Sequence, residues 1–130
     1  MQNLMEEKRV LLTEYLPSII QQLPFMVFVK DAQELRFLLL NKAGEEMIGY
    51  SQAEMLGKND YDFFPYDEAD FFKSKDRKVL EGGKVVDIPE EHIQTKNNGK
   101  LILHTQKIPL LDLKGTPIFL IGISQDITDK

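Results

Sequence analysis

Histidine and carboxylate side chains are the candidates in this sequence for acid–base or metal chemistry. His92 directly follows Glu90 and Glu91, and His104 lies in the next strand-like segment. A catalytic acid or base must reach the reacting atom together with its partner groups. On an extended strand, neighbouring side chains point to opposite faces of the sheet. We therefore predict that residues 90–92 are exposed, do not converge, and supply no catalytic site.

A run of carboxylates is a second candidate site, because hard cations such as Ca²⁺ take oxygen ligands. No lysine or arginine separates the members of this run, which are Asp60, Asp62, Asp67, Glu68 and Asp70. The run lacks the spaced aspartates and the glycine of a calcium-binding loop. Negative charge stabilises the start of a helix. We interpret these residues as solvated groups around a helix start and predict no metal site.

The composition excludes several classes of function. The sequence contains no cysteine, which excludes disulfides, thiolate metal sites and cofactors bonded through a thiol. Its 16 basic and 21 acidic residues give a net charge of −5, which disfavours nucleic acid and anionic membranes as partners. The apolar runs are too short to span a bilayer. We predict a cytoplasmic protein that inserts into no membrane, and its 130 residues suit one domain.

The elements that would position these residues begin with a helix. An apolar stripe at helical spacing runs from Met5 to Ile19 and predicts a helix in residues 1–23. We expect a break near Leu16, because the residue before a proline, here Pro17, avoids the helical conformation.

Two short strands, a block of helices and three longer strands follow. Asn98–Gly99 is a strong hairpin signal, and Ser51 with Glu54 matches a capping box at a helix start. The predicted strands are 25–31, 35–40, 84–95, 100–110 and 117–126. The predicted helices are 42–48, 51–57 and a longer one that begins at Tyr66 or Asp67 and stops at Gly82–Gly83. This order predicts an α+β fold, a five-stranded antiparallel sheet with helices on one face and an N-terminal flanking helix.

This order and several motifs resemble a PAS domain, a sensor module common in bacterial signalling proteins. The stretches that carry the resemblance are Leu23 to Asp31, Asn41 to Ser51, Gly57 to Pro65, Asp112 to Gly115, Gly122, and Asp126-Ile127-Thr128. The resemblance implies a flanking helix at residues 1–22 and a non-catalytic sensory or regulatory domain at 23–130. It also implies a multidomain parent protein, of the histidine kinase or diguanylate cyclase type, with an output domain downstream in the same chain.

Strand alternation predicts an apolar pocket on the inner face of the sheet. Because Lys30 and Arg36 are charged, we expect them to face outward, which places alternate residues inward. The strands would contribute Val27, Val29, Phe37, Leu39, Asn41, Leu103, Thr105, Leu120 and Gly122, and the helices would contribute Met47, Ile48, Leu56, Phe64 and Phe72. Glycine in a central strand leaves room for a ligand or a close side chain. The alternative is a packed core in a ligand-free dimerisation or spacer domain.

No cofactor is predicted for this pocket, and an occupant, where the core is not simply packed, would be an unidentified small molecule. Haem-binding relatives of the family carry a histidine in the long helix, and relatives that form flavin adducts need a cysteine. This sequence has neither, so we predict no haem and no covalent flavin. Lys107 is the one basic residue with an inward strand phase. Asn41 either caps the following helix or binds the ligand, and we favour the cap.

Two parts of the chain are predicted to contact other domains or a second copy of the protein. The apolar stripe of the N-terminal helix and the apolar outer face of the sheet predict a homodimer, with the helix covering part of that face. The end of the last strand, through Gly122, Asp126 and Thr128, is the predicted relay of the signal to the output domain.

Overall fold

The computed structural model describes residues 2–129, and its elements follow the predicted order. The helices are α1 (Gln2–Gln22), α2 (Lys42–Ile48), α3 (Gln52–Met55) and α4 (Tyr66–Gly82), with a 3-10 turn η1 (Asp60–Asp62). The strands are β1 (Met26–Asp31), β2 (Phe37–Leu40), β3 (Val86–Gln94), β4 (Lys100–Leu111) and β5 (Pro117–Asp126). Residues 1 and 130, the outermost residues of the two predicted segments, lie outside the described residues. No helix within residues 2–129 is both long and apolar enough to cross a membrane.

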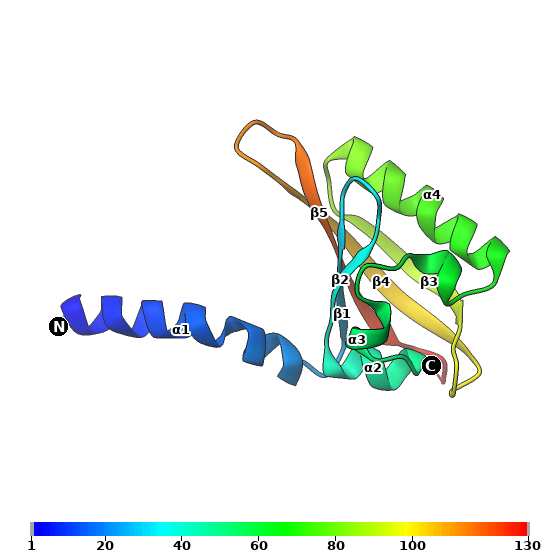
Figure 1. Ribbon diagram of the computed structural model, residues 1–130, viewed down its shortest axis with the longest axis horizontal. Coiled ribbons are helices and arrows are strands. Elements are labelled where there is room, and N and C mark those ends of the chain that lie inside the picture. The colour runs from blue at the N-terminus through cyan, green and yellow to red at the C-terminus, as the bar shows by residue number, and fades with distance from the viewer. Residues whose placement is uncertain (1, 130) are drawn as a thin grey trace.

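The five strands form one antiparallel sheet in the order β2-β1-β5-β4-β3. The last strand of the chain therefore pairs with the first and lies at the centre of the sheet. The helices α2, α3 and α4 gather beside the sheet, whereas the β4–β5 hairpin projects beyond it (Figure 1). The predicted α+β architecture is confirmed.

Local turn and capping chemistry fixes most element boundaries. Gly49 ends α2 in the left-handed conformation at φ 86°, which is strained for residues with a side chain. Ser51 and Glu54 form the predicted capping box at the start of α3. Residues 95–99 join β3 to β4, and the Thr95 amide donates to the Gly99 carbonyl at 2.9 Å. These boundaries are set by hydrogen bonds between residues a few positions apart, and such bonds can be predicted from the sequence.

The N-terminal helix departs from two expectations. α1 continues through Pro17 without the predicted break. It also does not cover the outer face of the sheet, because it extends away from the domain (Figure 1) and none of its described residues is buried. A proline at this site removes one amide donor, and an exposed helix can satisfy the freed carbonyl with water. The apolar side chains of α1 therefore remain at the surface.

The inner face of β1 is the opposite of the predicted one. Met26, Phe28 and Lys30 point to the helices, and Lys30 is only 2% exposed. The predicted inward residues Val27 and Val29 consequently lie on the other face. The prediction failed because it assigned the charge of Lys30 to solvent, whereas buried carboxylates from other elements neutralise that charge in the fold.

In β2 the predicted inner face is correct at Phe37 and wrong at Leu39. A register shift in the β1–β2 pair brings Phe37 opposite Lys30 and Leu40 opposite Phe28. Phe37 and Leu40 both line the interior, whereas Leu39 lies outside it. Strict alternation cannot place two residues three positions apart on one face, so the irregular pairing decided this side of the core.

Gly122 is expected to resist substitution, because Phe28 covers it. A Cβ atom at residue 122 would lie 2.0 Å from two atoms of the Phe28 ring. Gly122→Ala should lower the free energy of unfolding by about 1–3 kcal/mol through overpacking, as measured by urea denaturation. Gly82→Ala is the matched control, since no atom lies within 4 Å of its Cβ position. Gly122→Ala with wild-type stability would contradict the packing described here.

Candidate functional site

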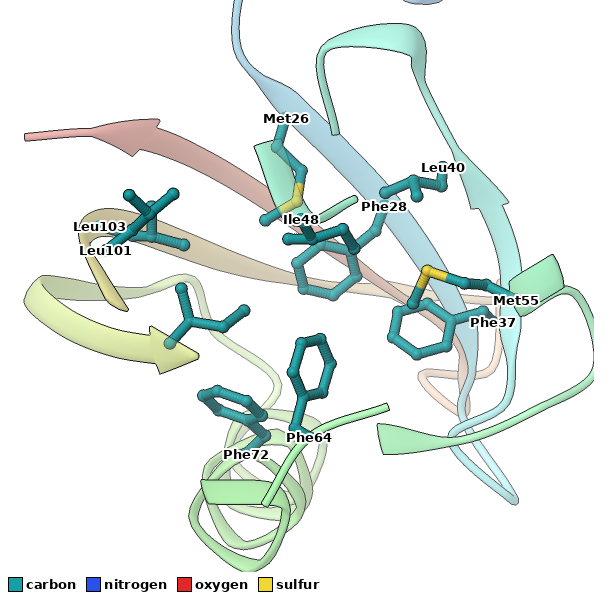
Figure 2. Close-up of a cluster of buried hydrophobic side chains, with 11 residues drawn as sticks. Met26, Phe28, Phe37, Leu40, Ile48, Met55, Phe64, Phe72, Leu101 and Leu103 are labelled. Carbon is teal, nitrogen blue, oxygen red and sulfur yellow. The ribbon is translucent and has the colours of Figure 1, made fainter. Parts of the chain in front are cut away.

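A cavity of about 30 Å³ lies between the sheet and the helices. Its apolar wall consists of Met26, Phe28, Phe37, Leu40, Ile48, Phe64, Phe72, Ile93 and Leu103. The rings of Phe64 and Phe72 point from the helical side toward the side chains of β1 (Figure 2). Phe64 and Phe72 meet edge to face with their centroids 5.5 Å apart, a favoured aromatic geometry. The cavity has room for about one or two water molecules.

Charged side chains complete the wall of this apolar cavity. We call Lys30, Asp60, Asp76, Glu91 and Lys107 the interior ion network; each is at most 5% exposed. Four of them line the cavity, and Asp76 joins the two lysines. The network connects five elements, β1, η1, α4, β3 and β4.

Asp76 of α4 is the centre of the network. Its Oδ2 accepts from Lys30 Nζ at 2.7 Å, and its Oδ1 accepts from Lys107 Nζ at 2.6 Å. Lys30 Nζ also donates to Asp60 Oδ2 at 2.7 Å. Such buried pairs persist only when hydrogen bonds offset the loss of hydration. The network therefore fixes α4 against the sheet through charge as well as through packing.

Glu91 forms the other end of the network. Its Oε1 accepts from the Thr105 hydroxyl at 3.0 Å, and its Oε2 lies 3.6 Å from Lys107 Nζ. Thr105 Oγ1 is also 2.7 Å from Ser124 Oγ. A hydroxyl has one hydrogen to donate, so Ser124 is the donor in this second bond. The chain of bonds thus reaches β5, the last strand of the chain.

The pKa values in the network follow from opposing effects of burial and charge. Burial alone would raise the pKa of Asp76, but the two lysines and their hydrogen bonds lower it below the ordinary value. Burial raises the pKa of Asp60, and Lys30 compensates only in part. Burial would lower the pKa of Lys30, but the charges of Asp60 and Asp76 raise it above the ordinary value. Of the two aspartates, Asp76 is therefore the one whose ionised form the network favours.

The stability contributed by Asp76 should disappear in acid. Because its folded pKa is depressed, this contribution is present above the unfolded pKa of about 3.9 and is lost as the pH falls through the folded pKa. The difference in unfolding free energy between the wild type and Asp76→Asn should be largest near neutral pH and shrink below about pH 4. Urea denaturation across this range measures the difference. A gap that stays constant with pH would contradict the assignment.

The structure brings together only some of the predicted pocket residues. Phe37, Ile48, Phe64, Phe72 and Leu103 line the cavity. Thr105 lies beside it, hydrogen-bonded to Glu91.

The other predicted pocket residues lie elsewhere. Val27, Val29, Leu39, Asn41, Met47, Leu56, Leu120 and Gly122 do not line the cavity. Leu56 is 45% exposed, because α3 ends before it, and Leu120 belongs to a second apolar cluster with Val79 and Leu80.

The sequence contained signals for two residues of the network, and only Lys107 was assigned an inward phase. Lys107 continues the inward alternation of Leu103 and Thr105, and Asp76 lies four residues after Phe72 on the buried stripe of α4. Each position fits a buried face by periodicity. Their charge argued against burial, and only the meeting of opposite charges from distant segments made burial favourable.

Two predictions about exposed carboxylates are wrong. Asp60, assigned to the solvated acidic run, is buried against Lys30. Glu91 is buried as well, because a register shift between Ile88 and Glu91 changes the alternation of β3. Glu90, Glu91 and His92 all border one surface groove, but Glu90 and His92 are exposed whereas Glu91 is buried. No group of three or more potential metal ligands occurs in the described part of the chain.

Asn41 uses its whole hydrogen-bonding capacity within the protein. Its Oδ1 accepts from the amides of Val27 at 2.8 Å and Gly44 at 3.1 Å. Its Nδ2 donates to the carbonyls of Ile20 at 3.0 Å and Phe25 at 2.9 Å. A side-chain amide has two donors and accepts about two bonds. Asn41 therefore caps α2 and ties it to β1 and α1, and it has no bond left for a ligand.

The exit of β5 is tied back to β4. Asp126 Oδ1 accepts from the Thr128 amide at 3.0 Å and from the Thr128 hydroxyl. The Ile102 amide in turn donates to Thr128 Oγ1 at 3.1 Å. These bonds extend the β4–β5 contact past the last residue of the strand.

Comparison of sequences matches residues 20–130 to the family model described as the PAS fold. The methanogenesis regulatory histidine kinase FilI of Methanothrix harundinacea is 33% identical over 103 residues, which are 79% of this chain and 11% of the kinase. A diguanylate cyclase of Vibrio cholerae is 34% identical over 113 residues, which are 85% of this chain and 35% of the cyclase. The chain thus spans a minor part of both relatives.

Solved structures share the fold at low sequence identity. A PAS domain from Colwellia psychrerythraea superposes with a TM-score of 0.78 at 17% identity, covering 92% of this chain and 99% of that chain. The LOV protein of Rhodobacter sphaeroides gives a TM-score of 0.74 at 17% identity, covering 91% of this chain and 68% of that chain.

Proposed function

Because the chain belongs to the PAS-fold family, we propose that it is a ligand-responsive sensory module without catalytic activity of its own. Two of its relatives are signalling proteins, a histidine kinase and a diguanylate cyclase. We propose that it regulates an output domain of one of these types in the same polypeptide. The cytoplasmic location remains a prediction from the sequence.

The interior ion network is the observation that carries this proposal. A domain of this size gains more stability from an apolar core than from buried charges. Here Lys30, Asp76 and Lys107 meet at a cavity and connect α4 to the sheet. A small change of charge or hydrogen bonding at the cavity would alter these bonds. A ligand shifts such an equilibrium when it has different affinities for the two arrangements.

Thr105, Ser124 and the end of β5 form the proposed relay. Ser124 couples the network to β5 through Thr105, and Asp126 with Thr128 holds the exit of that strand on β4. A change at Glu91 could therefore reach the segment that leads to an output domain. Gly122 participates through its contact with Phe28.

Asp126→Ala should weaken signalling more than folding. Asp126 is exposed, so its loss should change the free energy of unfolding of this domain by no more than about 1 kcal/mol. In the full-length protein the same change should reduce the response of the output activity several-fold, because Thr128 loses the two bonds to Asp126 that help to hold it beside β4. Output activity and urea denaturation measure the two effects. Equal losses in both would contradict the relay.

A ligand-free dimerisation domain is the second candidate function. It is favoured by the small cavity and by the exposed apolar side chains of α1, which include Leu4, Met5, Leu11, Leu12, Leu16 and Ile19. Native mass spectrometry of the purified chain tests the two candidates. A retained small molecule supports the sensory module. A dimer without any retained molecule, together with an output response that survives filling of the cavity by Leu103→Phe, supports the dimerisation domain.

A further inference from the structure

A surface groove between α4 and β3 meets the interior ion network at Glu91. The groove has a volume of about 230 Å³, and its wall is formed by Asp67, Glu68, Phe71, Glu90, Glu91 and His92. Glu91 also lines the interior cavity. Glu91 is thus shared by the groove and the interior cavity, and its carboxylate contacts Thr105 and Lys107 on the interior side.

Glu91 has a buried oxygen that lacks a hydrogen bond. Glu91 is 5% exposed, and its Oε2 finds no donor within residues 2–129. The ammonium of Lys107 lies 3.6 Å away, beyond hydrogen-bond distance, because it is held at 2.6 Å by Asp76. A buried carboxylate oxygen without a donor is unfavourable. A donor supplied from the groove would satisfy it.

The charges around the groove favour a cation as that donor. Four of its six lining residues are carboxylates, Asp67, Glu68, Glu90 and Glu91, and none is a lysine or arginine. Glu68 is partly engaged, since its Oε1 accepts from the Gln94 amide at 2.8 Å. Behind Glu91, the two ammonium groups of the network, on Lys30 and Lys107, are balanced by the two carboxylates of Asp60 and Asp76. The carboxylates of the groove are therefore not neutralised from the interior, and their negative charge attracts a cation into the groove.

Phe71 supplies the apolar part of the groove. The side chain is 44% exposed, and its ring lies on the same wall as the carboxylates. Lys75 Nζ already lies 5.7 Å from the centroid of this ring, a distance at which an aromatic face attracts a cation. An organic ligand with both an apolar part and a positive charge therefore matches the groove better than a bare ion does.

We propose that the groove binds a small organic primary amine, whose ammonium group donates to Glu91 Oε2 while its apolar part packs on Phe71. This assigns a ligand class to the proposed sensory module and rests on that proposed function. Binding would pull the Glu91 carboxylate toward the groove and away from Lys107 and Thr105. The ligand would thereby act on the same bonds that connect the network to β5.

Titration of the ¹⁵N-labelled chain with benzylammonium chloride tests this proposal by NMR. Saturable shifts are expected at the amides of residues 67–71 and 90–94. Benzyl alcohol, a neutral analogue of similar shape, and benzyltrimethylammonium, which is charged but has no N–H donor, should both bind at least about tenfold more weakly, because each lacks part of the charge-assisted hydrogen bond.

Variants separate the site from non-specific attraction. Glu91→Gln keeps an acceptor for Thr105 but removes the charge, and it should weaken binding at least about tenfold. Phe71→Ala changes a partly exposed side chain, so the fold survives, and it should also weaken binding. Glu81→Gln, an exposed acidic position at the far end of α4, is the control and should leave binding unchanged.

Equal binding of benzyl alcohol would overturn the proposal, as would the absence of saturable shifts or wild-type affinity in both Glu91→Gln and Phe71→Ala. These failures are distinguishable from failure of the sensory function. If native mass spectrometry detects a different retained molecule, the sensory module stands and the amine site falls. If amines bind in the groove but the output activity of the full-length protein does not respond to them, the site stands and the sensory role falls.

Discussion

Asp76→Ala should lower the free energy of unfolding by about 3–5 kcal/mol, the usual cost of removing one partner of a buried ion pair. The substitution leaves the ammonium groups of Lys30 and Lys107 buried, and Lys107 then retains only Glu91, 3.6 Å away. Lys30 keeps Asp60 as a partner. Urea denaturation followed by circular dichroism measures the loss.

Two further variants test the origin of this loss. Glu81→Ala, which removes an exposed carboxylate from the same helix, should change stability by no more than about 0.5 kcal/mol. The free energy of unfolding of the double variant Asp76→Ala with Lys107→Met should fall by less than the sum of the two single losses, by at least about 1 kcal/mol. The reason is that the effects of substitutions at residues in direct contact are not additive. Simple additivity would show that Asp76 and Lys107 do not stabilise each other.

Asn41→Ala is the second substitution with a large expected effect, a loss of about 2–4 kcal/mol. Asn41 is fully buried and makes four hydrogen bonds to backbone groups of Ile20, Phe25, Val27 and Gly44. Alanine removes the cap of α2 and leaves backbone donors and acceptors without partners in a site that water enters poorly. Urea denaturation is again the direct measurement.

Asn97→Ala is the matched control for this change. Asn97 is exposed in the turn between β3 and β4 and should tolerate alanine within about 0.5 kcal/mol. Hydrogen exchange adds a local test, because the amides of Val27 and Gly44 should lose protection in the Asn41 variant. If Asn41→Ala had the same free energy of unfolding as Asn97→Ala, the bonds of Asn41 to α2 and β1 would not stabilise the fold.

The order of elements was predictable because it depends on interactions between near neighbours in the chain. Gly49, the Ser51–Glu54 capping box and the Asn98–Gly99 turn each act within a few residues. The antiparallel sheet followed from strand segments separated by a block of helices. Asn41 was correctly assigned as a cap because its position between a strand and a helix suits that role.

For the N-terminal helix, the sequence predicted the helix and its apolar face but not what that face contacts. The apolar residues of α1 do recur at helical spacing, but spacing does not say what covers them. The helix extends into solvent in this structure, so the predicted homodimer through α1 and the outer face of the sheet remains a proposal.

Tertiary structure alone decided which charges are buried. Lys30 meets Asp60 and Asp76, which lie 30 and 46 residues away in the chain, and Lys107 meets Asp76 from 31 residues away. A single buried lysine is unfavourable, and a single buried aspartate is too, so each residue taken alone is assigned to the surface. Only the folded arrangement brings the opposite charges within hydrogen-bond distance, and their mutual attraction then offsets the hydration that each group has lost.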